Sequence, residues 1–218
     1  MLKKMLVLLL VFCSYTSWAE PVGAYGQGDF LLSIGAVYAP LGLGSDWGEV
    51  NMVDDTQHIR HDAKLGQPAI GGEIQALYFV NPYVAAGLSF QDKYFGMDLA
   101  SGWQNNVTTR QRSFMATGRV FFNPKGEYKF YLPLGLGFTH TDMSADFGQN
   151  EHFKYTGFAY FIGLGCEKRF SEKRSLGFEL RYNGNKFHDS LFSWEGNKLR
   201  VYDQANYIST VLRFNYMI

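Results

Sequence analysis

Apolar and polar residues alternate through eight segments of this chain, and this period of two constrains its fold more than any other feature. In the first segment, for example, Phe30, Leu32 and Ile34 share one face. Successive side chains of a β-strand point to opposite sides, so the pattern predicts strands with one apolar face. Pro133 cannot donate a ladder hydrogen bond, so we expect a local bulge there. The predicted strands cover approximately residues 29–38, 69–80, 84–90, 114–122, 130–138, 158–164, 176–182 and 208–218.

The connections between these segments alternate between short and long. Three are tight turns, at 81–82, 123–128 and 171–175, and four are longer and polar, at 39–68, 95–109, 141–153 and 184–205. Short periplasmic turns and long extracellular loops are typical of outer-membrane barrels. An even number of strands also places both ends of the barrel domain on the periplasmic side.

The first nineteen residues have the pattern of an export signal. Lys3 and Lys4 precede an apolar stretch at 5–12, and Ser17 and Ala19 are small residues at the positions that a signal peptidase reads. We therefore predict a cleaved signal peptide at 1–19, a barrel domain at 20–218, and a location in a Gram-negative outer membrane. No later stretch of about 18 apolar residues predicts a membrane-spanning helix.

Charge and cysteine content exclude some classes of function. The signal holds two of the twenty basic residues and none of the twenty acidic ones, so the remaining chain is nearly neutral. This balance gives no reason to expect nucleic acid as a partner. Cys13 would leave with the signal, so Cys166 would remain alone and no disulfide is predicted within the chain. We expect no cofactor.

The polar face of the predicted strands is unlike a solvent-exposed surface. It consists mainly of Gly, Ala, Ser and Thr, whereas the outside of a soluble lipocalin-like barrel would be rich in Lys, Glu and Thr. Small residues around a few charges indicate a narrow interior, in which each charge needs an opposite partner. We expect Arg119 and Arg181 to pair with Glu73 and Glu179 in a filled interior, and a narrow gated pore is the alternative. The predicted interior charges are Glu73, Lys93, Arg119, Glu167, Glu179, Arg181 and Arg213.

Aromatic residues lie at both ends of several apolar faces. They form three pairs, each eight residues apart: Phe30 and Tyr38, Phe114 and Phe122, and Phe130 and Phe138. Eight residues in a strand tilted by about 40° separate two rings by roughly 20 Å along the membrane normal. That separation is close to the height of the apolar band between the two aromatic girdles of a membrane barrel, about 25 Å. The spacing favours a lipid-facing exterior.

Together these patterns resemble the small eight-stranded outer-membrane barrels, a group that includes OmpA transmembrane domains, OmpX and the neisserial opacity proteins. The resemblance covers about 28–218 and implies a closed antiparallel eight-stranded up-and-down transmembrane β-barrel. The segment from Leu212 to Ile218 resembles the C-terminal signal that the barrel-assembly machinery reads, although Ile218 stands where the family usually has Phe. The implied partners are that machinery, outer-membrane lipid and lipopolysaccharide.

One tripeptide, His188-Asp189-Ser190, is a candidate for catalysis. Lipid A deacylase barrels place a His and a Ser two residues apart near the penultimate strand. A nucleophilic Ser also needs a group to orient its base, here Glu195 or Asp203. The deacylase motif lies within a strand, whereas this tripeptide falls in a predicted loop. We therefore predict no catalytic residues and keep a lipid A hydrolase as the alternative.

The predicted loops contain two further clusters. The first could bind a divalent cation, but a solvated loop is the favoured interpretation: Asp54, Asp55, His58, His61 and Asp62. The second consists of aromatic residues that either contact a receptor or lipopolysaccharide or cap the barrel mouth: Trp103, Phe147, Phe192 and Trp194. Because the unusual residues concentrate in loops, we predict a non-enzymatic structural or surface-interaction role, of the adhesion or opacity type, with a possible extracellular ligand.

Overall fold

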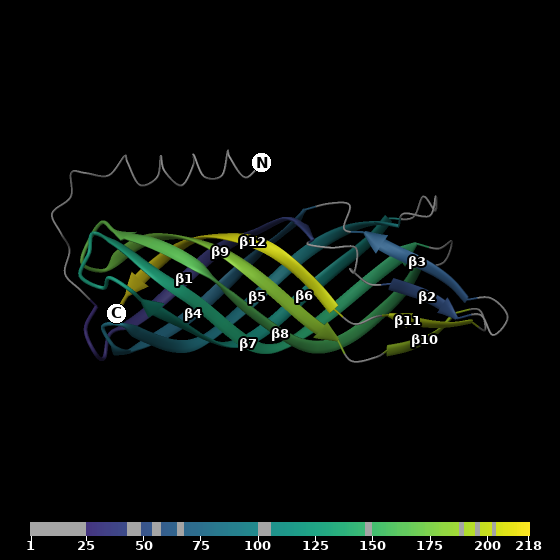
Figure 1. Cartoon of the computed structure of the whole chain (residues 1–218), viewed down its shortest axis with the longest axis horizontal. Coiled ribbons are helices and arrows are strands. Elements are labelled where there is room, and N and C mark those ends of the chain that lie inside the picture. Colours follow the sequence, from purple (N-terminus) through teal and green to yellow (C-terminus); the bar gives the residue numbers. More distant parts are fainter. Residues whose placement is uncertain are drawn as a thin grey trace.

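Eight antiparallel strands close into a barrel in the computed structural model (Figure 1). The structure describes residues 25–42, 49–53, 58–64, 68–99, 106–146, 150–187, 190–194, 197–201 and 204–218. Each barrel strand pairs with the next barrel strand along the chain, and the first and last strands close the ring through pairs such as Leu32 with Tyr216. The predicted closed eight-stranded fold is therefore confirmed. The barrel strands are β1 (Phe30–Gly42), β4 (Ala69–Asn81), β5 (Val84–Leu99), β6 (Asn106–Phe121), β7 (Tyr128–Asp146), β8 (Asn150–Arg169), β9 (Arg174–Phe187) and β12 (Gln204–Met217).

The three tight turns lie together at one end of the barrel, which we call the turn end. They join β4 to β5, β6 to β7 and β8 to β9. At the second of these, the side-chain amide of Asn123 donates to the carbonyl of Tyr128 while its oxygen accepts from the N–H of Phe130. The N–H of Ile218 donates to the carbonyl of Phe30, so the first and last barrel strands also meet there.

The opposite end, the loop end, contains more β-structure than predicted. Four short strands form a second sheet in the order β10-β11-β2-β3, beyond the barrel rim and away from the C-terminus (Figure 1). Two pairs, Ala63 with Leu99 and Lys64 with Asp98, connect this sheet to β5. The expectation that 39–68 and 184–205 are loops was therefore wrong over the strands β2 (Glu49–Val53), β3 (His58–Lys64), β10 (Ser190–Trp194) and β11 (Asn197–Val201).

Two other predicted loops are largely strand as well. The β5–β6 ladder continues to the pair Asp98 with Asn106, and the β7–β8 ladder continues to Asp146 with Asn150. Backbone pairing does not require an apolar face, so the ladders continue where the alternation of side chains stops. Sequence periodicity therefore located the membrane part of each strand and missed its extension.

Whether the number of a barrel-strand residue is even or odd decides which face of the barrel it occupies. Even-numbered residues such as Ile34, Ile74 and Leu136 point outward and are more than half exposed, whereas their odd-numbered neighbours point inward. The expected bulge at Pro133 was wrong, because the pairs on either side of it, Tyr131 with Gly165 and Leu134 with Ile162, keep one register. Among the described residues, no helix is long and apolar enough to cross a membrane.

Candidate functional site

The structure places all seven predicted interior charges on inward-facing positions. Their exposed fractions lie between 0 and 2 %. They come from six strands around the ring, because the barrel wall directs every second residue of each strand to the same enclosed space. The seven are Glu73 on β4, Lys93 on β5, Arg119 on β6, Glu167 on β8, Glu179 and Arg181 on β9, and Arg213 on β12.

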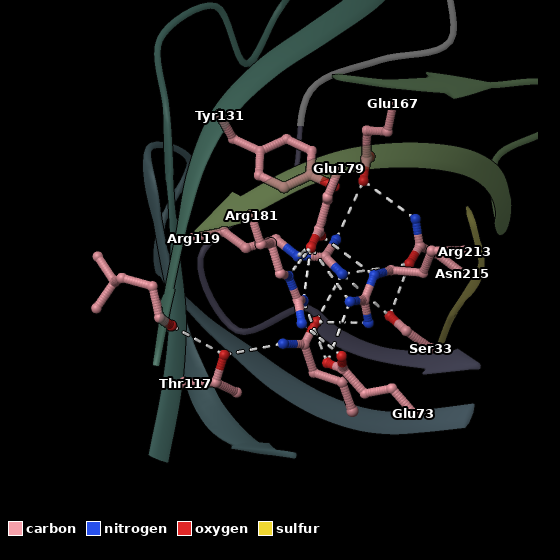
Figure 2. A network of polar contacts seen from close by, with 12 residues as sticks. Ser33, Glu73, Thr117, Arg119, Tyr131, Glu167, Glu179, Arg181, Arg213 and Asn215 are labelled. Carbon is pink, nitrogen blue, oxygen red and sulfur yellow. Dashed lines mark hydrogen bonds and ion pairs between the residues drawn. The ribbon is translucent and has the colours of Figure 1, made fainter. Parts of the chain in front are cut away.

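Two arginines and two glutamates form the centre of this cluster (Figure 2). Arg181 lies 2.6 Å from Glu73 and 2.5 Å from Glu179. Arg213 contacts the same two carboxylates at 3.1 and 3.2 Å. Each guanidinium group therefore bridges both carboxylates, and the strands β4, β9 and β12 are linked through the interior.

Arg119 and Glu167 complete the charged cluster. Arg119 lies 3.3 Å from Glu167 and 3.7 Å from Glu179. Three guanidinium groups thus face three carboxylates, and the formal charges balance. Removing one member of such a buried set leaves an uncompensated charge, which costs about 3–5 kcal/mol in soluble proteins. We call Glu73, Arg119, Glu167, Glu179, Arg181 and Arg213 the six-charge cluster.

Uncharged polar residues bind the cluster, and the sequence analysis did not single them out. The side-chain oxygen of Gln75 accepts from Arg119 at 2.6 Å and from Arg213 at 3.2 Å. The amide of Asn215 donates to Glu167 at 3.1 Å. Both residues have odd numbers and therefore face the interior, as the alternation predicts. Nothing in the sequence indicates which charged residue each one binds.

Tyr131 supplies a further contact to the cluster. Its hydroxyl donates to Glu179 at 2.8 Å, and the guanidinium carbon of Arg119 lies 4.9 Å from its ring centre. A Cβ atom at Gly165 would lie 2.4 Å from the Tyr131 ring, so glycine at this position makes room for the aromatic side chain. The small residues of the interior therefore accommodate the large ones on neighbouring strands.

Aromatic rings close the interior at the turn end. Tyr25 stacks on Phe79 with ring centres 4.2 Å apart, and Phe121 lies 5.5 Å from Tyr25 and 5.6 Å from Phe79. The hydroxyl of Tyr25 also donates to Glu167. Tyr25 precedes the first strand, and no periodicity marks it, so sequence reasoning had no signal for this aromatic plug.

The two interior lysines lie apart from the six-charge cluster. Lys93 donates to the hydroxyl of Tyr207, and no carboxylate of the described part of the chain forms an ion pair with it. Lys129, which was not predicted as a site residue, donates to the carbonyls of Pro124 at 2.7 Å and Gly126 at 3.1 Å. Lys129 therefore binds the turn between β6 and β7.

The six predicted girdle residues all lie on the outside of the barrel. Their exposed fractions range from 37 % for Phe30 to 74 % for Phe138. Large exposed apolar side chains of this kind cover the outward face of all eight barrel strands. A water-soluble barrel would bury such side chains, whereas a lipid environment accepts them. The full set is Phe30, Tyr38, Phe114, Phe122, Phe130 and Phe138.

The remaining candidates fall largely beyond the described residues. His188, Asp189, Glu195 and Asp203 lie outside them, and Ser190 is described only as the first residue of β10. Among the predicted metal-binding residues, Asp54 and Asp55 lie outside, and His58, His61 and Asp62 are placed only by their backbone in β3. Of the loop aromatics, Trp103 and Phe147 lie outside, whereas Phe192 and Trp194 belong to β10. Among the residues that the structure describes, no group of three His, Cys, Asp or Glu side chains could hold a metal ion.

A closed barrel with an apolar exterior and a filled polar interior defines an outer-membrane β-barrel protein. Comparison with known families agrees: residues 5–214 match the outer membrane protein beta-barrel domain, and the chain belongs to that family. Its members reside in the outer membrane of Gram-negative bacteria, which is the location this membership indicates. A search of curated protein sequences gave no match.

Among solved structures, one with a TM-score above 0.5 shows the same fold at low sequence identity, and others are similar at lower scores. The outer membrane protein OprG from Pseudomonas aeruginosa is 13 % identical, with 91 % of this chain and 99 % of that chain covered and a TM-score of 0.60. Ail, the attachment invasion locus protein of Yersinia pestis, is 17 % identical over 88 % of this chain and 99 % of its own, with a TM-score of 0.49. The outer membrane protease OmpT from Escherichia coli is 10 % identical over 94 % and 99 %, with a TM-score of 0.43.

Proposed function

We propose that this protein is a non-enzymatic outer-membrane barrel with a sealed interior, acting through its loop end in a surface-interaction role of the adhesion or opacity type. The packing of the interior is the observation that supports this proposal. Arg119, Glu179 and Arg213 each have 0 % exposure. Residues that line a water-filled channel retain accessible surface, and an eight-stranded barrel is only wide enough for side chains to fill it.

The loop end supplies an extended surface for contacts. In this family type the end opposite the tight turns faces the outside of the cell. β7 continues from Phe138 to Asp146, roughly 20 Å beyond the predicted girdle. The hairpins β2–β3 and β10–β11 come from the first and last connections of the chain, and they join through pairs such as Lys198 with Val53. Ordered segments on a rigid scaffold are where binding functions tend to lie.

Planar lipid bilayers test the sealed interior. The purified full chain should give no discrete conductance steps, because the six-charge cluster and the aromatic plug fill the cross-section. Reproducible conductance steps from the wild-type protein would overturn the sealed barrel and favour the gated pore instead.

Cell adherence tests the surface role. Bacteria displaying the full chain are compared with bacteria whose chain carries a Gly-Ser linker in place of residues 49–64. We expect reduced adherence to epithelial monolayers and to fibronectin-coated plastic. The control replaces Ser171, Glu172 and Lys173 of a turn-end connection with Gly-Ser-Gly and should adhere like wild type. Equal adherence of all three strains would contradict the proposal.

The non-enzymatic part of the proposal is tested on lipid A. Mass spectrometry of lipid A from cells with and without the protein should show no difference. If cells with the wild-type protein lacked an acyl chain of lipid A, and cells with a Ser190→Ala variant retained it, the hydrolase alternative would be favoured.

A further inference from the structure

Four phenylalanines form a continuous row across the outside of β5, β6, β7 and β8. Phe90 pairs with Phe114, Phe114 with Phe138, and Phe138 with Phe158. All four are between 41 and 74 % exposed. Phe114 and Phe138 are the predicted loop-end girdle rings of β6 and β7. Phe90 on β5 and Phe158 on β8 are their direct pairing partners, so the row marks the loop-end edge of the apolar band.

Charged residues follow this row immediately toward the loop end. The next outward-facing positions are Arg112 and His140, which pair across β6 and β7, and the positions after those include Lys154. Two residues along a tilted strand correspond to about 5 Å along the membrane normal. The cations therefore lie at the depth of lipid head groups and directly above the rings. We call Asp92, Arg110, Arg112, His140, Asp142 and Lys154 the charged patch.

The charged patch occupies one side of the barrel. On β1, β4 and β12, the outward-facing residues described by the structure include no charged side chain. At their loop ends these strands present apolar residues, such as Tyr38, Ile70 and Ile208. A general attraction to head groups would place cations around the whole ring. The described outward-facing cations at the loop end lie on β5–β8 and, as Lys186 beside Phe158, on β9, so they are confined to one side and indicate a localised site.

A groove connects the Phe row to the charged patch. It has a volume of about 530 Å³, and its lining includes Phe90, Phe114 and Phe138 on one side and Arg112, His140 and Thr156 on the other. Apolar rings beside a guanidinium group and other hydrogen-bond donors suit an amphiphile whose anionic head and acyl chain are adjacent.

The donors of Arg112 are only partly used within the protein. One terminal nitrogen donates to Asp142, and the buried Nε atom has no hydrogen-bond partner among the described residues. The side chain as a whole remains 38 % exposed, so it can accept a further partner at the groove. Asp142 also lies 3.2 Å from His140, so the carboxylate holds both side chains at the groove. A phosphate oxygen is a strong acceptor for a guanidinium group and would use the donors that Asp142 leaves free.

We propose that this groove binds lipid A, with a phosphate on Arg112 and His140 and an acyl chain along the Phe row. Lipid A carries phosphates next to acyl chains and forms the outer leaflet of the outer membrane, which the loop end of the barrel faces. The site lies on the lipid-facing wall and does not depend on the surface-interaction role of the loop-end sheet.

Native mass spectrometry of the folded full chain in detergent tests the proposal. The variant Arg112→Gln/Lys154→Gln removes two cations of the patch and should weaken binding of bis-phosphorylated lipid A by about tenfold or more, since hydrogen bonds to charged groups are lost. The control Lys173→Gln/Arg174→Gln removes two exposed cations at the turn end and should bind like wild type. Equal affinities for all three proteins, or an equal loss in the control, would overturn the site.

Other ligands separate the possible sources of phosphate. Monophosphoryl lipid A should bind more weakly than the bis-phosphorylated form, and inorganic phosphate should not displace lipid A. Phosphatidylglycerol bound by wild type as tightly as lipid A would overturn the assignment to lipid A. Folding of each variant is checked by its heat-modifiable gel shift. His140→Gln/Lys154→Gln, which leaves the Arg112–Asp142 pair intact, is a second variant expected to weaken lipid A binding.

Discussion

The interior and the outer wall of this barrel use the same pair of groups in opposite surroundings. Arg181 and Glu73 lie 2.6 Å apart inside the barrel, with their side chains 1 and 0 % exposed. Arg110 and Asp92 also lie 2.6 Å apart on the outer wall, with their side chains 43 and 25 % exposed. The equal N–O distances do not imply equal interaction energies, because water screens the outer ion pair and is excluded from the inner one.

This difference suggests two roles for charge in one protein. Inside, the six-charge cluster links strands that are distant in sequence, and loss of any member leaves another one buried without compensation. Outside, solvent screens the charged patch, so we expect its ion pairs to contribute little to stability. The following predictions test this contrast, in order of decreasing expected effect.

Glu179→Gln should produce the largest loss of stability. It leaves Arg181, Arg213 and Arg119 with one carboxylate fewer in a water-free interior, so we expect a decrease of about 3–5 kcal/mol in the free energy of unfolding. Urea unfolding of the barrel in detergent or lipid measures it. Glu172→Gln, in an exposed turn, is the matched control. An unchanged free energy for Glu179→Gln would show that the cluster does not stabilise the fold.

Tyr131→Phe should have an intermediate effect. The substitution keeps the ring beside Arg119 and removes only the hydroxyl that donates to Glu179. Hydrogen bonds to charged groups contribute about 1.5–3 kcal/mol, so the same unfolding experiment should show a loss of that size. Tyr83→Phe at an exposed turn residue should be neutral. A loss as large as that of Glu179→Gln would mean that the ring itself had moved.

Asp142→Asn on the outer wall should cost less than about 1 kcal/mol. Its partner Arg112 is 38 % exposed and Asp142 is 28 % exposed, so solvent screens the pair. In 1 M salt the Debye length falls to about 3 Å, and the small difference between wild type and variant should disappear. A cost that matched the interior substitutions and persisted in high salt would contradict the comparison.

The stability that the Arg112–Asp142 pair contributes should depend slightly on pH in the acid range. Burial raises the pKa of Asp142, but the hydrogen bond from Arg112 and the charges of His140, Arg112 and Lys154 outweigh it and hold the pKa below its usual value of 3.8. A depressed pKa adds stability above the unfolded value, and this contribution is lost as the pH falls through the folded value. Wild type and Asp142→Asn should therefore differ at pH 7 and converge below pH 3.8. If the stability difference between wild type and Asp142→Asn increased in acid, the sign of this pH dependence would be the opposite of the one predicted.

The sequence by itself determined the barrel and, within the membrane part of each strand, the face that each residue occupies. Alternation is a local property, since the side-chain period of two holds wherever the chain is extended, so Arg119 and Glu179 were placed inside before any pairing was known. The same periodicity failed at the loop end. Polar residues on both faces of β5 to β8 removed the signal there, although the backbone ladder continues to Asp98 and Asp146.

Only the tertiary structure decided which interior groups meet. Arg181 and Glu73 are 108 residues apart, and their contact depends on how the eight strands are staggered when the ring closes. Closure also brings Tyr25 onto Phe79 and Lys93 to the hydroxyl of Tyr207. Pairing across the ring is set by the relative register of several strands, and that register is a property of the whole barrel rather than of any one segment.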